Sequence, residues 1–268
     1  MDPRQEVLRA VPRWADTAWE MQSHLLRALL LKHPTVAASH TSAAVLYGLP
    51  LPNRFADPRL HVATTVKNAR IRRPGVVLHR VTDFGFVTIL GHQLISAPYL
   101  FLQLAPAWQL QDLVRLGDAM IGNWHGPPLC SLGALTQLAA SKKYLRGRER
   151  VQAALGLIRP DVDSPMETDL RLWTISVGLP EPSVHPAVHC SALGCEVHPD
   201  LGYREAQLAL EYEGDHHRTD RRQWDTDISR VNALVQEGWQ VIRVNSRTDR
   251  RTLEQTIRAR LRESGLIP

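Results

Sequence analysis

The sequence predicts an α/β (α+β) protein in which helices and short strands alternate along 268 residues. Apolar residues recur with helical spacing in several stretches, whereas other stretches alternate strictly between apolar and polar side chains. Proline and glycine separate these stretches at short intervals. The chain is long enough for two domains, and its 44% hydrophobic and 22% charged residues are ordinary for a globular protein.

The first predicted domain covers residues 1–158. Ser39 is expected to be the N-cap of a short helix that Gly48 ends. Helices are predicted over residues 17–32, 40–47, 96–104, 108–121, 132–140 and 149–158, and strands over residues 60–64, 76–80, 86–89 and 93–95.

The second predicted domain covers residues 159–268, after an Arg-Pro-Asp-Val-Asp-Ser-Pro junction. Ser164 and Glu167 have the spacing of a capping box, which predicts that a helix begins there and ends at Gly178. The expected order is αβββαβ followed by a last helix. The strands are predicted over residues 183–189, 195–201, 207–213 and 239–244, and the later helices over residues 224–237 and 248–264.

The stretch Pro199–Arg230 carries the candidate site. Strand alternation puts Glu211 and Glu213 on the face opposite Leu210, and Asp200 joins them if the two strands pair. Carboxylates that converge in this way repel one another unless a cation lies among them. Oxygen ligands of this kind suit Mg²⁺ or Mn²⁺.

A formal net charge of +5 and a pI near 9.4 favour a polyanionic partner. Residues 142–150 read KKYLRGRER, a tyrosine among five cations. This run, with Lys142 and Lys143, is either a solvated loop or a surface that contacts phosphates. Three cysteines and no N-terminal apolar segment predict a cytoplasmic protein with no membrane partner.

The second domain resembles the PD-(D/E)XK nuclease superfamily, and within it the Vsr-like endonucleases. Four features carry the resemblance in the expected order, namely Glu167 on the first helix, Asp200-Leu201, the run EYEGDHH at 211–217 and Gly238-Trp239-Gln240-Val241. The resemblance implies a restriction-endonuclease-like fold that hydrolyses DNA phosphodiester bonds with a divalent metal. Glu213 stands where the superfamily has lysine.

The resemblance also implies roles for individual residues. Asp200, Glu211 and Glu167 would bind Mg²⁺ or Mn²⁺, with Glu213 in the catalytic group and His217 as the base or the leaving-group acid. Residues expected to contact DNA are Arg218, Arg221, Arg222, Arg230, Lys142 and Lys143. Phage defence or DNA repair would be the setting.

The first domain resembles the AbiEi-type antitoxins of toxin–antitoxin systems, through the run SHTSAAVLYGLP at 39–50. About 16 residues precede the first predicted helix, so the winged helix of that family is expected to be largely missing. This resemblance implies an alternative function, a non-catalytic DNA-binding antitoxin or regulator of a type IV system with a cognate toxin as partner.

Two other clusters are not expected to be sites. Ser39, His40 and Ser42 lie on one helix start, where a serine and its neighbour do not easily adopt the geometry of a nucleophile and base. The set His185, His189, Cys190, Cys195 and His198 lacks the spacing of a structural zinc site. An ordinary hairpin with its turn at Ser191–Gly194 is the interpretation that we prefer for this segment.

Overall fold

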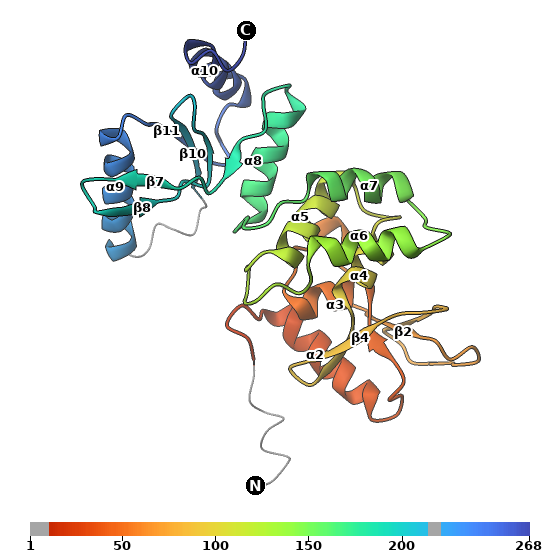
Figure 1. The fold of residues 1–268 in the computed structure, drawn as a ribbon. Coiled ribbons are helices and arrows are strands. Elements are labelled where there is room, and N and C mark those ends of the chain that lie inside the picture. The colour runs from red at the N-terminus through yellow and green to blue at the C-terminus, as the bar shows by residue number, and fades with distance from the viewer. Residues whose placement is uncertain (1–10, 214–220) are drawn as a thin grey trace. The chain divides into compact units, whose positions relative to one another are not determined.

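The computed structural model describes residues 11–213 and 221–268, with the backbone alone over residues 221–227. It contains helices and mixed sheets, as an α/β fold requires (Figure 1). The chain divides into two units, Met1–Pro160 and Asp161–Pro268. The division falls two residues after the boundary expected from the sequence.

Unit 1 is built on a mixed sheet with the strand order β3-β2-β1-β5-β4. β2 pairs in parallel with β3 and β1 in parallel with β5, while β1–β2 and β4–β5 are antiparallel. The strands are β1 (Ala37–Ala38), β2 (Leu60–Thr64), β3 (Val76–Arg80), β4 (Phe86–Ile89) and β5 (His92–Ile95). β1 was not predicted, because two alanines carry no alternating pattern.

Helices cover this sheet and continue into a helical layer. α2 and α3 pack on β2 and β5, and α3 in turn contacts α4. The helices are α2 (Thr17–Leu30), α3 (His40–Tyr47), α4 (Ala97–Leu104), α5 (Leu110–Ile121), α6 (Leu132–Ser141) and α7 (Arg148–Leu157), and a 3₁₀ turn covers Asn53–Phe55. Each predicted helix of this domain is present with ends shifted by at most a few residues.

Gly48 ends α3 as predicted, with a left-handed φ of 70°. A side chain there would also be excluded by space, because a Cβ atom would lie 2.8 Å from the Trp14 ring and 2.9 Å from His125. Ser39 is the N-cap residue, but its side chain makes no capping hydrogen bond. The prediction that Ser39 is the N-cap residue is confirmed, and its hydroxyl contacts a neighbouring imidazole.

Unit 2 is built on a four-stranded sheet with the order β11-β10-β9-β6 and a separate β7–β8 hairpin. β10 is antiparallel to β9 and parallel to β11. The strands are β6 (Ser183–Val184), β7 (Val188–Cys190), β8 (Cys195–Val197), β9 (Leu201–Tyr203), β10 (Leu208–Tyr212) and β11 (Gln240–Val244). The helices are α8 (Pro165–Ser176), α9 (Arg221–Gln236) and α10 (Arg250–Glu263).

Two strands that the sequence predicts as continuous are each divided in the structure. The first breaks at His185 and Pro186, where His185 adopts a φ of 42°, and the second breaks around Pro199. Proline cannot donate a ladder hydrogen bond, and a positive φ leaves the extended region. The parts of the two predicted strands that flank the turn at Ser191–Gly194 therefore form the β7–β8 hairpin. The parts farther from that turn become β6 and β9 of the main sheet.

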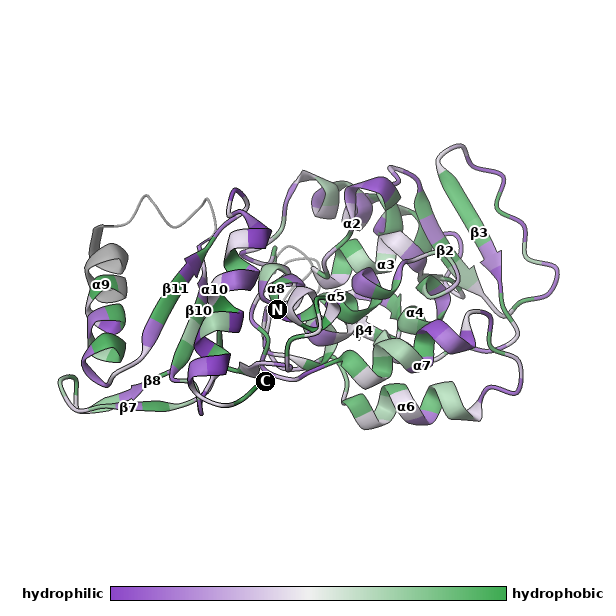
Figure 2. Cartoon of the chain, turned by 90° about the horizontal axis from the view of Figure 1, so that it is seen from above, coloured by the Kyte–Doolittle hydropathy of each residue, from purple (hydrophilic) through white to green (hydrophobic). Residues whose placement is uncertain are grey.

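Side-chain alternation along β10 gives the sheet two apolar faces. Leu208 and Leu210 pack with Leu170 of α8 and Ile257 of α10. Ala209 points the other way, into a cluster formed with α9 and the hairpin. In Figure 2, hydrophobic and hydrophilic segments are mixed along β10, β11 and α10. The candidate site lies at the end of this sheet where β10 ends, at Tyr212.

No helix in the described part of the chain is long and apolar enough to cross a membrane.

Candidate functional site

The first side chain of the site comes from the start of α8. The Glu167 amide donates to Ser164 Oγ at 3.2 Å, and the same hydroxyl donates to Glu167 Oε1 at 2.7 Å. Glu167 Oε2 accepts from the amide of Asp163 at 3.0 Å, rather than from that of Ser164 as an ideal capping box would. The carboxylate is thereby fixed and is 6% exposed.

His185 is the second side chain, and its backbone is held on both sides. Its amide donates to the Asp200 carbonyl at 3.1 Å, and its own carbonyl lies 3.2 Å from His198 Nδ1. This places His185 Nε2 3.2 Å from Glu167 Oε2 and 3.8 Å from Asp163 Oδ2. The hydrogen bond to Glu167 raises the pKa of His185, because it favours the imidazolium.

Asp200 is the third side chain, immediately before β9. Its Oδ2 accepts a hydrogen bond from the Tyr212 amide at 2.7 Å. Burial, and next the charge of Glu167, raise the pKa of Asp200 to about 6, although the Tyr212 amide, His185 and Arg230 act in the opposite direction. A carboxyl group with this pKa titrates close to neutral pH, where it can hold or release a proton.

Glu167, His185 and Asp200 form one cluster, which we call the acidic site. One ligand atom from each residue lies within 4.8 Å of the others. Two carboxylates so close in a half-buried place repel each other, and a positive charge between them relieves the repulsion. The protonated His185 can supply that charge, and so can a divalent cation bound by the same atoms.

The other predicted carboxylates lie nearby but outside this group. Continuing the β9–β10 register by one residue places Glu211 opposite Asp200. Glu211 is also paired across the parallel ladder with Arg243 of β11. Glu213 Oε1 accepts from Arg243 Nη1 at 2.7 Å, so this side chain turns toward β11 and not toward Asp200. Glu167 and Asp200 therefore converge, whereas the acidic site as described contains neither Glu211 nor Glu213.

Of the residues predicted to contact DNA, Arg230 lies close to the acidic site, whereas Lys142 and Lys143 belong to unit 1. Arg230 of α9 donates to the His198 carbonyl at 2.9 Å and lies close enough to lower the pKa of Asp200. Lys142 Nζ lies 3.1 Å from Asp83 Oδ2 and above the Tyr99 ring, while Lys143 lies beside the exposed Tyr144. His217 and Arg218, and the side chains of Arg221 and Arg222, lie outside the described residues.

The two clusters that the sequence disfavoured can now be judged. Ser39 Oγ and His40 Nδ1 lie 3.1 Å apart, within hydrogen-bond distance. Ser39 is fully buried, and a buried hydroxyl cannot reach a substrate. Cys190 stands opposite Cys195 in the β7–β8 pair, which confirms the predicted hairpin.

His185 is the member of the acidic site that the sequence interpretation missed, since it was considered only beside the cysteines. A signal was nevertheless present. The predicted hairpin pairs Cys190 with Cys195, and the same register, continued past the break, places His185 opposite Asp200. The imidazole and the carboxylate could therefore have been brought together from strand pairing alone.

In comparisons with known proteins, the chain is similar to proteins that are described as uncharacterised. It is 25% identical over 215 residues to two uncharacterised proteins of Mycobacterium tuberculosis, one from strain CDC 1551 and one from strain H37Rv. The similarity covers 75% of this chain and 71% of each relative. No family model matches the chain, and no solved structure matches it.

Proposed function

We propose that unit 2 is a divalent-metal-dependent endonuclease that hydrolyses DNA phosphodiester bonds in the cytoplasm, in phage defence or DNA repair. The observation that carries the proposal is the convergence of Glu167, His185 and Asp200 at the end of the sheet. The burial that raises the pKa of Asp200 supports it, because ionised carboxylates in such a place are stabilised by a bound cation.

The donor set fits a divalent cation. Glu167 and Asp200 offer the oxygen ligands that Mg²⁺ and Mn²⁺ prefer, and the imidazole of His185 favours Mn²⁺ of the two. When bound, such a cation lowers the pKa of an attacking water and neutralises charge that develops on the phosphate.

The protein's own residues have separate tasks in this proposal. Ser164 and the Asp163 amide hold the Glu167 carboxylate in a fixed orientation. Without a bound cation, His185 can take up and release a proton next to both carboxylates. Arg230 supplies a positive charge beside Asp200, where a phosphate oxygen would need it. His217 keeps its proposed role as base or leaving-group acid from the resemblance alone.

The test is nicking of supercoiled plasmid by the full chain with Mg²⁺ or Mn²⁺. We expect Asp200→Asn and Glu167→Gln each to lower the nicking rate by at least about 100-fold, as the loss of a metal ligand does. Glu205→Gln is the matched control, because it neutralises an exposed carboxylate of the same unit outside the acidic site. Glu211→Gln then shows whether this neighbour of Asp200 takes part.

The other results would each change the conclusion. Absence of cleavage of DNA and RNA with either metal would favour the non-catalytic DNA-binding antitoxin or regulator, with a toxin as its partner. Nicking that survives both Asp200→Asn and Glu167→Gln would indicate a contaminating nuclease and would leave the acidic site without a catalytic role.

A further inference from the structure

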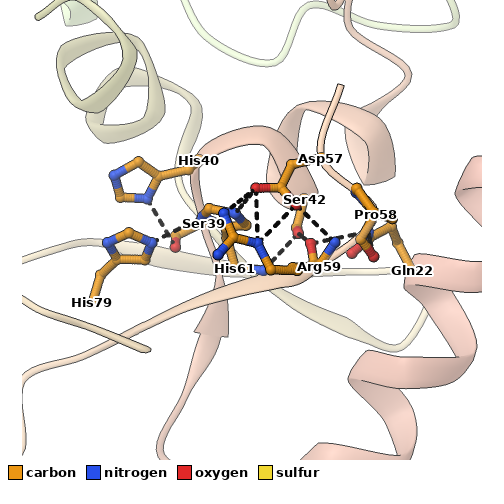
Figure 3. A network of polar contacts seen from close by, with 9 residues as sticks. All are labelled: Gln22, Ser39, His40, Ser42, Asp57, Pro58, Arg59, His61 and His79. Atoms are coloured by element: carbon orange, nitrogen blue, oxygen red, sulfur yellow. Dashed lines mark hydrogen bonds and ion pairs between the residues drawn. The ribbon is translucent and has the colours of Figure 1, made fainter. Parts of the chain in front are cut away.

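Three histidines from separate elements of unit 1 meet at one place, which we call the histidine cluster (Figure 3). His40 is the first residue of α3, His61 lies in β2 and His79 lies in β3. The parallel register pairs Ala63 with His79, so His61 and His79 stand two positions apart on the same face of the sheet. The elements that carry them are joined by the Ser39 amide, which donates to the His61 carbonyl at 2.9 Å.

The ring nitrogens are close together. His61 Nδ1 and His79 Nε2 are 3.0 Å apart, and the His40 ring stacks on the His79 ring with centroids 3.8 Å apart. One nitrogen from each of the three rings lies within 4.8 Å of the others. All three residues are half-buried.

A carboxylate orients the central ring. Asp57 Oδ2 lies 3.0 Å from His61 Nε2, and Arg59 holds that carboxylate with Nη2 at 2.7 Å. The proton of His61 therefore lies on Nε2, toward Asp57, and its Nδ1 lone pair faces His79. Metal-bound histidines in proteins are oriented in the same way by an outer carboxylate.

Two of the three rings have lowered pKa values, which favour the neutral form. Burial and the neighbouring histidines lower the pKa of His40 to about 3, and burial and His61 lower that of His79 to about 4. Both imidazoles are therefore neutral at pH 7, and the neutral imidazole is the form that binds metals. His40 further adopts a φ of 49°, a costly conformation of the kind that is concentrated at functional sites.

We propose that His40, His61 and His79 form a binding site for one divalent transition-metal ion, of which Zn²⁺ is the representative. Among the described residues, the clustered ligand atoms are three imidazole nitrogens, a set that favours Zn²⁺, Co²⁺ or Ni²⁺ over Mg²⁺. Three histidine ligands fill three positions of a tetrahedral zinc site and leave the fourth to water. The site is separate from the acidic site of unit 2 and does not depend on the nuclease proposal.

The experiment uses the full chain, stripped of metal, and measures Zn²⁺ binding by competition with a chromophoric chelator. We expect one tight site per chain, and we expect Zn²⁺ to raise the melting temperature. His79→Gln should weaken this site at least about 10-fold and reduce the thermal shift, because it removes one of three ligands. Asp57→Asn should weaken binding by about 10- to 100-fold without changing the stoichiometry.

Two controls make the result specific. His24→Gln removes an exposed histidine of α2 in the same unit, and His185→Gln removes the imidazole of the acidic site. Both variants should retain the tight site. Absence of Zn²⁺ binding in the wild type, or undiminished binding in both His79→Gln and Asp57→Asn, would overturn the proposal and leave the three rings as a hydrogen-bonded cluster. If His79→Gln does not fold, Asp57→Asn decides.

Discussion

At the scale of single residues, the charge of the acidic site depends on whether Asp200 and His185 carry a proton. Burial and Glu167 disfavour the ionised form of Asp200, while the hydrogen bond that His185 donates to Glu167 favours the ionised form of His185. The pKa values of both groups are therefore raised, that of Asp200 to about 6. Pairs of titratable groups whose environments alter their pKa values in this way are typical of sites that exchange protons.

The raised pKa of Asp200 has a measurable effect on stability in the absence of metal. Its ordinary pKa is 3.8 and its folded value is about 6, so the folded state binds more protons between these two pH values. The free energy of unfolding should therefore fall as pH rises, by roughly 2 kcal/mol between pH 4 and pH 6, and this contribution should level off above about pH 7. The contribution of His185 is lost at higher pH, above its ordinary value of 6.5.

Asp200→Asn isolates this effect, because asparagine can still accept the hydrogen bond from the Tyr212 amide. We expect the variant to be more stable than the wild type at pH 7, by about 1 to 3 kcal/mol. The two proteins should be nearly equal at pH 4. Urea unfolding at both pH values in the presence of a chelator measures this, and an equal difference at both would show that Asp200 titrates normally.

The sequence indicated part of the acidic site. Asp200 and Glu167 were predicted, because a capping box and a strand boundary can be read locally. The ion pair between Glu213 and Arg243 could not be predicted from the sequence, because it depends on the parallel pairing of β11 with β10. The histidine cluster escaped notice for a similar reason, since His40, His61 and His79 are far apart in the chain and carry no motif.

At the scale of elements, the first turn of α8 both begins a helix and holds a site carboxylate. Ser164 accepts the Glu167 amide and donates to the Glu167 side chain. The cap therefore connects helix stability to the orientation of the acidic site. Asp249 caps α10 in the same unit by accepting the Thr252 amide at 2.9 Å, without any link to the site.

This pair of caps supports a matched experiment. Ser164→Ala and Asp249→Ala should each lower the free energy of unfolding by about 1 kcal/mol, the usual cost of losing an N-cap. Ser164→Ala alone should also lower the pKa of His185, because a less ordered Glu167 carboxylate gives a weaker hydrogen bond. NMR titration of the imidazole measures this, and equal His185 pKa values in both variants would show that Ser164 does not orient Glu167.

Helices were easier to predict than strands in this chain. Caps and glycine stops such as Gly48 fix helix ends within a few residues of sequence. Strand limits instead depend on partners, and the breaks at His185 and Pro199 divided two predicted strands into four. The proline residues were visible, but the sequence alone did not show which half would leave the main sheet.

At the scale of the whole molecule, the chain contains two units with separate cores. In unit 2, Leu170, Leu210 and Ile257 belong to one cluster built from α8, β10 and α10. Unit 1 buries its own set, which includes Trp108, Phe101 and Leu60. Each unit therefore has the apolar interior that independent folding requires.

We expect residues 1–160 and residues 161–268 to fold when they are produced separately. Each fragment should unfold cooperatively in urea, and the far-UV circular dichroism of the two should add to that of the full chain. Residues 161–268 should also retain the raised pKa of His185, whose partners all lie in unit 2. A fragment without a cooperative transition would show that its core is incomplete without the other unit.

The parallel pairing of β10 with β11 has a consequence for how unit 2 folds. The β7–β8 hairpin closes a turn of four residues, Ser191–Gly194, and can form as soon as that segment is made. β11 cannot pair with β10 until the chain through Val244 has been synthesised. The connection between the two strands, which includes α9, must also have brought β11 alongside β10. Because such non-local closure is slow, the edge of β10 remains open to other strands during synthesis, and this interval is when unit 2 is most exposed to aggregation.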